Sequence, residues 1–207
     1  MQLSQKKSTE LLKKYRIPAV DSVLIRKEQE LSKIKSFPAA MKIDSPDIMH
    51  KSDEGCVIVN VGKDGLIGAY RKIISAAKRK KARINGVAVQ PMVKGTEVII
   101  GMKRDGQFGP VIMFGLGGIM VEVMKDVAFR IAPVCREEAL KMINEIKGAK
   151  ILNGYRNMPK ADINKLAEII TKLSSLSLNE KSITEIDLNP VITGPNKAIA
   201  VDARILQ

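Results

Sequence analysis

The sequence predicts a mixed fold of the α/β (or α+β) class, built as two lobes of a single domain. Its 207 residues are 45% hydrophobic and 28% charged, a balance typical of a globular chain with one sizeable core or two smaller ones. Segments with helical spacing of apolar residues alternate with short strand-like apolar runs along the whole chain. Neither a repeat nor a linker is visible, but the pattern changes near residue 90. We therefore expect lobes of residues 1–90 and 91–207.

The first part of the chain is expected to mix helices with strands. Residues 1–15 have the pattern of an amphipathic helix, and residues 64–83 place Ile67, Ile73, Ile74 and Ala77 at helical spacing. In order, the expected elements are helix 1–15, strand 19–25, helix 27–36, strand 37–43, strand 56–61 and helix 64–83.

The rest of the chain is expected to be rich in strands. Pro159 and Asp162 are typical of a helix start, and "TGPN" (193–196) predicts the turn of a final hairpin. The expected elements are strands 86–93, 97–104, 110–115 and 127–132, helices 136–146 and 161–177, and strands 182–192 and 197–205.

The chain is strongly basic, with a formal net charge of +13 and a pI near 9.8. Much of the excess lies in "RKIISAAKRKKAR" (71–83), which contains no acid. A nucleic acid is one polyanion that such a run could bind. Against this, the chain has no Trp and only 3% aromatic residues, so bases would find few stacking partners. A solvated helix face, or attraction of nucleotides, CoA-type cofactors or an acidic partner subunit, explains the charge equally well, and we expect no specific nucleic-acid binding.

No targeting or membrane segment is expected. The most apolar stretch, "VIMFGLGGIMVEVM", is interrupted by three glycines and Glu122, and the N-terminus lacks the apolar core of a signal peptide. Cys56 and Cys135 are far apart and form no metal-binding pattern. The chain is therefore expected to be cytoplasmic, with reduced thiols.

His50 is the only histidine of the chain, and it lies in "SPDIMHKSDEG" (45–55), which we call the histidine segment. Its imidazole could be a surface group without special chemistry. As a free base near neutral pH, it could also act as a nucleophile or a proton carrier.

Three further features suit the chemistry of phosphate groups, which needs cations, backbone donors and a divalent ion. Lys42 ends an apolar strand, and the glycines of "GLGG" (115–118) let backbone N–H groups approach an anion. Near the C-terminus, "EIDLNP" and "VDAR" are expected to place Asp187, Asn189 and Asp202 on neighbouring strands, with the first two on one face. Such a set of acids and an amide suits Mg²⁺. Each Asp or Asn taken alone is also typical of a turn, and Lys42 taken alone is typical of a strand edge.

The stretch "GMKRDGQFGPVIMFGLGGIMVEVMKDVAFRIAP" (101–133) resembles the signature of the ATP-grasp β subunits of ADP-forming acetyl-CoA synthetases. "MKIDSPDIMHKSDEG", "EIDLNPVI" and "VDARI" occur in the order and spacing of that family, so the resemblance covers about residues 10–205. It implies an ATP-grasp fold whose two lobes clamp a nucleotide. It also implies a reversible reaction in which acyl-CoA, ADP and phosphate give free acid, CoA and ATP.

The resemblance also assigns roles to individual residues. It makes His50 the relay that passes a phosphoryl group to ADP, and Lys42 a phosphate contact. Asn189 and Asp202 match Mg²⁺ ligands, and Asp187 matches an acid that supports a phosphohistidine. The remaining matches are the adenine hinge at 90–93 (Gln90, Met92, Val93), Glu97 near the ribose, and the turn of Gly115, Gly117 and Gly118, which faces the partner's phosphohistidine.

The implied cofactors are Mg²⁺ and ATP or ADP, with GTP or GDP as alternatives. The implied partner is a CoA-binding α subunit in an α₂β₂ complex, and the chain alone is expected to be inactive. Two departures concern Pro91, where the family often has Glu, and Cys56, which replaces a glycine after the histidine segment. Arg156, in a segment that also departs from the family, is assigned only weakly.

A rival interpretation is a non-catalytic regulatory ATP-grasp domain of the kind fused to acetyltransferases. Such a domain shares the long signature but does not need the relay histidine, so the presence of His50 counts against it.

Overall fold

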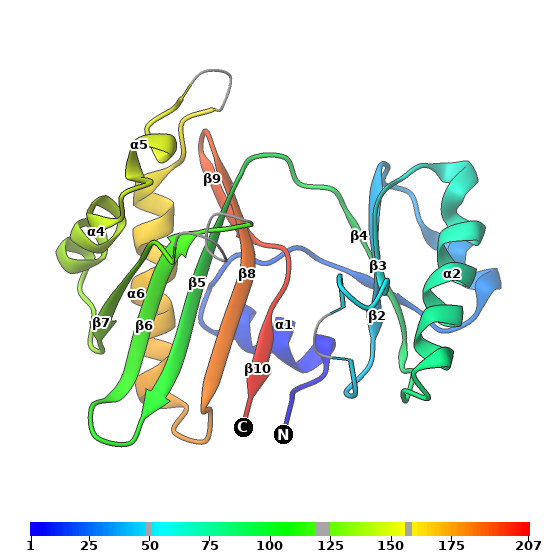
Figure 1. The fold of residues 1–207 in the computed structure, drawn as a ribbon, viewed down its shortest axis with the longest axis horizontal. Coiled ribbons are helices and arrows are strands. Elements are labelled where there is room, and N and C mark those ends of the chain that lie inside the picture. Colours follow the sequence, from blue (N-terminus) through cyan, green and yellow to red (C-terminus); the bar gives the residue numbers. More distant parts are fainter. Residues whose placement is uncertain (49–50, 119–124, 156–158) are drawn as a thin grey trace. The chain divides into compact units, whose positions relative to one another are not determined.

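The computed structural model describes residues 1–48, 51–118, 125–155 and 159–207 (Figure 1). These residues form two compact units, Val20–Met92 and a larger unit made of Met1–Ala19 with Val93–Gln207. His50 and Arg156 lie outside the described residues. The fold is a mixed α/β fold, as the sequence predicts, and its sheets are antiparallel.

The smaller unit is a four-stranded antiparallel sheet with the strand order β1-β4-β2-β3. Helix α2 (Leu66–Arg79) covers one face of this sheet, because its apolar residues recur at helical spacing and are buried there (Figure 1). The strands are β1 (Val23–Ile25), β2 (Ala39–Asp44), β3 (Val57–Val61) and β4 (Gly86–Pro91), and the short helices are η1 (Glu28–Lys33) and η2 (Lys63–Gly65).

The larger unit is built on a six-stranded antiparallel sheet with the order β10-β8-β5-β6-β7, in which β9 also pairs with β8. Its strands are β5 (Thr96–Asp105), β6 (Gly109–Leu116), β7 (Val127–Ile131), β8 (Glu185–Gly194), β9 (Lys197–Ala200) and β10 (Arg204–Leu206). Helices α4 (Arg136–Glu145) and α6 (Ile163–Asn179) pack against one face, where every second strand residue is buried (Figure 1). The other face, which we call the second face, carries the alternate side chains.

Most expected elements are present, with four differences. The expected helix 27–36 is the 3₁₀-helix η1, the strand expected at 19–25 is only Val23–Ile25, and α5 (Ala149–Leu152) was not expected. The last expected strand, 197–205, is divided into β9 and β10, because the chain bends at Val201 and the next two residues are irregular. The N–H of Val201 still donates to the carbonyl of Pro190 (3.0 Å), in register with the β8–β9 pairing. Asp162 caps α6 as predicted, accepting from the N–H of Lys165 at 3.0 Å.

The N-terminal segment belongs to the larger unit, whereas the sequence analysis grouped it with the first lobe. Leu12 of α1 (Gln5–Lys14) and Ile17 are buried in the core of the larger unit. The N–H of Leu3 donates to the carbonyl of Ile205 at 2.9 Å, next to β10. Among the described residues, no helix is long and apolar enough to cross a membrane.

Candidate functional site

Lys42 and Gln90 lie on the same face of the smaller sheet, opposite helix α2. In β2, Met41 and Ile43 face the core under α2, so Lys42 between them points to the other side. Lys42 pairs with Ala88 of β4, two residues from Gln90. Both side chains are buried, with exposed fractions of 7% and 4%. Lys42 therefore lies within a central strand that is paired on both sides, not at a strand edge.

The predicted hinge, residues 90–93, begins with the last two residues of β4 and continues beyond it. Pro91 is the exposed last residue of that strand and pairs with Ala39 of β2. The N–H of Met92 donates to the carbonyl of Pro38 at 3.1 Å, which fixes the backbone just after the proline. Met92 ends the smaller unit and Val93 begins the larger one, so the two hinge residues belong to different units.

The predicted glycine turn packs directly against Glu97. The N–H of Gly117 donates to the carbonyl of Glu97 at 2.8 Å. A Cβ on Gly117 would lie 2.9 Å from the Cβ of Glu97, so the turn approaches β5 closely only because residue 117 has no side chain. Gly118 has a φ of +66°, the left-handed region that glycine adopts freely. The structure thus brings together the glycine turn and the residue predicted to lie near the ribose.

Asp187 lies on the second face of the larger sheet, because its neighbours Ile186 and Leu188 face the core. Asn189 is exposed and lies where the register between β5 and β8 shifts, so the regular alternation of β8 is interrupted there. Asp202 differs from the prediction, because it lies in the connection between β9 and β10 and not on a strand. Arg204, two residues after Asp202, begins β10 and pairs directly with Asp187 of β8.

Two acids and one arginine surround Asp187. Burial raises the pKa of Asp187 above its ordinary value. The Arg204 guanidinium opposes this rise, whereas the negative charges of Glu185 and Asp202 add to it. One side-chain oxygen of Asp187, Oδ1, is buried and accepts no hydrogen bond from the described residues. Arg204 also forms an ion pair with Glu185, with Nη2 3.1 Å from Oε1.

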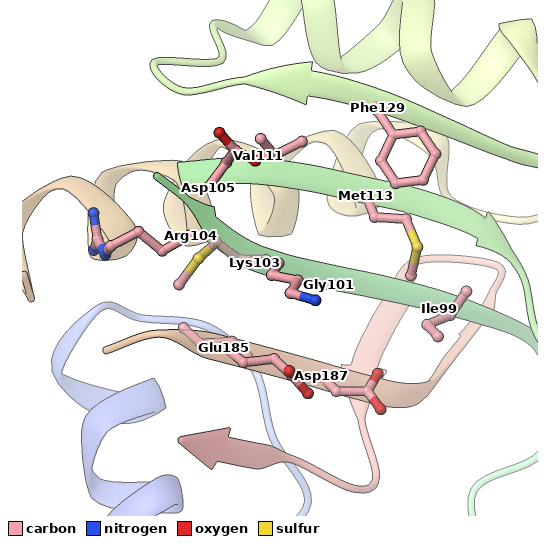
Figure 2. A pocket seen from close by; sticks show the side chains of 12 residues that line it. Ile99, Gly101, Lys103, Arg104, Asp105, Val111, Met113, Phe129, Glu185 and Asp187 are labelled. Carbon is pink, nitrogen blue, oxygen red and sulfur yellow. The ribbon is translucent and has the colours of Figure 1, made fainter. Parts of the chain in front are cut away.

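A cavity of about 460 Å³ opens on the second face beside Asp187. Gly101 lines this cavity, and it pairs with Met113 on one side and with Asp187 on the other. Figure 2 shows Phe129 and Met113 on one side of Gly101 and Asp187 on the opposite side, so an apolar wall faces an acidic one. Such a mixture of apolar surface and a few polar groups is typical of a binding site.

The donor set near β8 fits a hard divalent cation. Asp202 and Asn189 supply a carboxylate and an amide oxygen, the ligand types that Mg²⁺ prefers. The negative charge of Asp202 acts on Asp187, so a cation here would relieve repulsion between two acids. Within the described parts of the chain, no group of three or more His, Cys, Asp or Glu residues could hold a metal ion. A cation at this place would therefore need the amide oxygen of Asn189 as a ligand in addition to carboxylates.

The described part of the histidine segment is attached to the smaller unit at several points. Ile48 is buried in the core, and Asp47 forms hydrogen bonds with Arg83. Cys56, which follows the segment, is fully buried, and its N–H donates to the carbonyl of Lys51 at 2.8 Å. The thiol that departs from the family pattern is therefore a core residue.

Three residues that lie around Asp187 or line the cavity were not predicted from the sequence: Glu185, Arg204 and Lys103. The alternation of β8 already placed Glu185 on the face of Asp187, so this acid could have been identified. Lys103 pairs with Glu185, and Arg204 pairs with Asp187, each across neighbouring strands. The local sequence pattern does not encode the register between strands that are distant in the chain.

Comparison with known proteins identifies similar chains. A family model described as an ATP-grasp domain matches residues 1–206. The chain is 46% identical to the β subunit of acetate–CoA ligase [ADP-forming] I of Pyrococcus furiosus, over 99% of this chain and 91% of that subunit. It is also 46% identical to acetate–CoA ligase [ADP-forming] I of Archaeoglobus fulgidus, over 86% of this chain but only 26% of that longer protein.

Solved structures of one archaeal protein also match over nearly the whole chain. The dinucleotide forming acetyl-coenzyme A synthetase 1 of Ca. Korarchaeum cryptofilum, in complex with coenzyme A and Ca-AMPCP, has a TM-score of 0.94 at 40% identity. The alignment covers 99% of this chain and 93% of that one. A second structure of that protein holds coenzyme A and Mg-AMPPCP, with a phosphohistidine segment pointing towards the nucleotide binding site; its TM-score is 0.83, at 38% identity over 99% and 92% of the two chains.

Proposed function

Because this chain belongs to the ATP-grasp domain family, we propose that it is the nucleotide-binding β subunit of an ADP-forming acetate–CoA or related acyl-CoA ligase. The observation that carries the proposal is the match to a separate β subunit over nearly the full length of both chains. The longer relative, of which this chain spans about a quarter, supports a division of the reaction between this chain and other parts.

In the proposed reaction, acyl-CoA, ADP and phosphate give free acid, CoA and ATP, and the reaction is reversible. A histidine of the partner α subunit is phosphorylated first, with the phosphoryl group taken from inorganic phosphate as acyl-CoA is converted to free acid and CoA. A ring nitrogen of His50 then attacks this phosphoryl group, so that one N–P bond forms as the partner's N–P bond breaks. The terminal phosphate oxygen of ADP next attacks the phosphoryl group on His50, forming ATP and releasing the neutral imidazole. Two transfers through a good leaving group divide one high barrier into two lower ones.

Residues of both units have roles in nucleotide binding in this proposal. Lys42 holds phosphate oxygens, and its strand, paired on both sides, gives it a rigid base. Asn189 and Asp202 hold Mg²⁺, which neutralises charge on the phosphate groups. Gln90, Met92 and Val93 contact the adenine from the hinge, and Glu97 contacts the ribose.

The second face of the larger sheet is proposed to receive the partner's phosphohistidine. Asp187 accepts an imidazole N–H there, and its buried oxygen without a described donor supports this role. The turn of Gly115, Gly117 and Gly118 is proposed to face the same anionic group. The N–H of Gly117 is already donated to the carbonyl of Glu97, so this group is not available to an anion. We propose an α₂β₂ complex in the cytoplasm, and the free thiols of Cys56 and Cys135 are consistent with a reducing compartment.

The proposal is tested by mixing the purified chain with a CoA-binding α subunit. ATP should form from ADP and phosphate only when both chains and acetyl-CoA, or another acyl-CoA, are present. The chain alone should bind Mg-ADP but produce no ATP. ATP synthesis by the chain alone would contradict the proposal. Nucleotide binding without synthesis in the presence of the α subunit would instead indicate a regulatory ATP-grasp domain.

A further inference from the structure

Two ion pairs connect the end of the basic run to the histidine segment, and we call them the charged clamp. Arg83 pairs with Asp47, and Lys80 pairs with Glu54. Asp47 lies three residues before His50, and Glu54 lies four residues after it. The clamp therefore fastens the chain on both sides of the only histidine.

The Arg83–Asp47 pair has a geometry that holds its partners firmly. Nη2 of Arg83 donates to Oδ1 of Asp47 at 2.6 Å, and Nε donates to Oδ2 at 3.0 Å. The backbone N–H of Arg83 also donates to Oδ2, at 2.7 Å. A two-pronged contact of this kind fixes orientation as well as distance. It also lowers the pKa of Asp47 to about 2, mainly through the side-chain hydrogen bonds from Arg83.

The end of helix α2 is shaped so that Arg83 can reach Asp47. Lys81 has a φ of +55°, the N–H of Lys81 donates to the carbonyl of Lys78, and the N–H of Ala82 donates to that of Ala77. These two bonds form a Schellman motif, which ends the helix and reverses the chain direction.

The histidine segment is also closed at its base. The N–H of Ile43, in β2, donates to the carbonyl of Cys56 at 2.9 Å, and Lys42 pairs with Val57 of β3. The two ends of the segment therefore meet beside Lys42, the proposed phosphate contact. Ile48 adds an apolar anchor, with only 4% of its surface exposed.

We propose that Arg83 and Lys80 are positioning residues for phosphoryl transfer through His50. This inference rests on the proposed function. Both pairs are partly exposed to solvent, with Arg83 77% and Lys80 55% exposed, so they add little to the stability of the fold. Transfer between two histidines and a nucleotide depends strongly on the alignment of the reacting atoms. Loss of the clamp is therefore expected to slow transfer much more than it lowers stability.

The test measures single-turnover transfer from the phosphorylated α subunit to Mg-ADP in the preformed complex. Arg83→Ala is expected to lower the transfer rate by about tenfold or more while leaving the Mg-ADP affinity within about twofold of wild type. Arg79→Ala is the matched control, because it removes the same charged group from the same basic run, and no ion pair of Arg79 is recorded among the described residues. Its transfer rate should remain within about twofold of wild type.

A double-mutant cycle tests whether the pair itself is responsible. Asp47→Asn should slow transfer to the same extent as Arg83→Ala, and the double variant should be no slower than either single variant. Additive losses, or an Arg83→Ala rate equal to that of Arg79→Ala, would overturn the inference.

A second measurement does not depend on activity. Amide hydrogen exchange at residues 51–56 of the isolated chain should be faster in Arg83→Ala than in wild type, and unchanged in Arg79→Ala. Equal exchange in all three proteins would show that the clamp does not fix the segment, which overturns the inference even where the wild type is active. If exchange differs as expected but the wild-type complex transfers no phosphoryl group, the proposed function is wrong, and the positioning role falls with it.

Discussion

Gly117 has no room for a side chain. A Cβ at this position would lie 2.9 Å from the Cβ of Glu97 and 3.0 Å from its carbonyl carbon, so the backbone would have to move. We expect Gly117→Ala to lower the free energy of unfolding by about 1–3 kcal/mol, the usual cost of overpacking. The control is Gly106→Ala, because a Cβ on Gly106 meets no atom within 4 Å. Denaturant unfolding that gives equal stability for the two variants would contradict the close approach of the turn to β5.

The Arg83–Asp47 pair gives a defined dependence of stability on pH. The folded-state pKa of Asp47 is lowered to about 2, whereas an unfolded Asp titrates near 3.9. A lowered pKa contributes stability above the unfolded value and loses it as the pH falls towards the folded value. Because the pair is largely exposed to solvent, the effect on stability is small. Wild type should exceed Asp47→Asn slightly in unfolding midpoint at pH 6, and this small difference should shrink between about pH 4 and pH 2. A difference that stays constant, or grows, as the pH falls would rule out the lowered pKa.

The position of a single residue was predictable from the sequence where the alternation of apolar and polar residues shows on which face of a strand its side chain lies. The alternation of β8 predicts that Asp187 lies on the face opposite the core, and it does so in the structure. The shift in register next to Asn189 was not predictable from this pattern. Arg204 was not predicted as a neighbour of Asp187, because that contact requires the register between β8 and β10. Likewise, Arg83 appeared only as part of a basic run, since nothing local indicates that it returns to Asp47.

The connection between β9 and β10 holds Asp202, the proposed Mg²⁺ ligand. Asp202→Ala removes one carboxylate from the donor set, so the affinity for Mg-ADP should fall by about tenfold or more, while unfolding stays cooperative. Calorimetry with and without Mg²⁺ measures this, and the variant should lose most of the effect of the metal. The control is Glu137→Ala, which removes an exposed acid from helix α4. Equal Mg²⁺-dependent affinities in wild type and Asp202→Ala would remove Asp202 from the site.

Long elements with a clear period were predicted most accurately. Helices α2, α4 and α6 and strands β5 and β6 follow from their apolar spacing and boundary residues. The short elements η1 and α5 carry too few residues to show a period, so their type was not predictable. The division of the last strand into β9 and β10 comes from a bend at Val201 and two irregular residues after it, which the apolar pattern of the segment does not indicate.

At the scale of the whole molecule, the sequence indicates a change of character near residue 90, and the two units of the structure meet in the chain at Met92 and Val93. The N-terminal helix was grouped with the wrong neighbours, because an amphipathic pattern shows that a helix has an apolar side but not which core covers it. Leu12 and Ile17 could have been buried in either unit, and only the fold assigns them to the larger one.

The relay through His50 is the central claim, and one variant separates its two half-reactions. In a complex of the His50→Ala chain with its α subunit, acyl-CoA and phosphate should still phosphorylate the α subunit, because this step does not need the imidazole of the β chain. Transfer from the phosphorylated α subunit to Mg-ADP should fall by orders of magnitude, on the order of a thousandfold or more, because a covalent step is lost. Mg-ADP should still bind to the variant. A rate of ATP synthesis close to that of wild type in the His50→Ala complex would contradict the relay and leave this histidine without a chemical role.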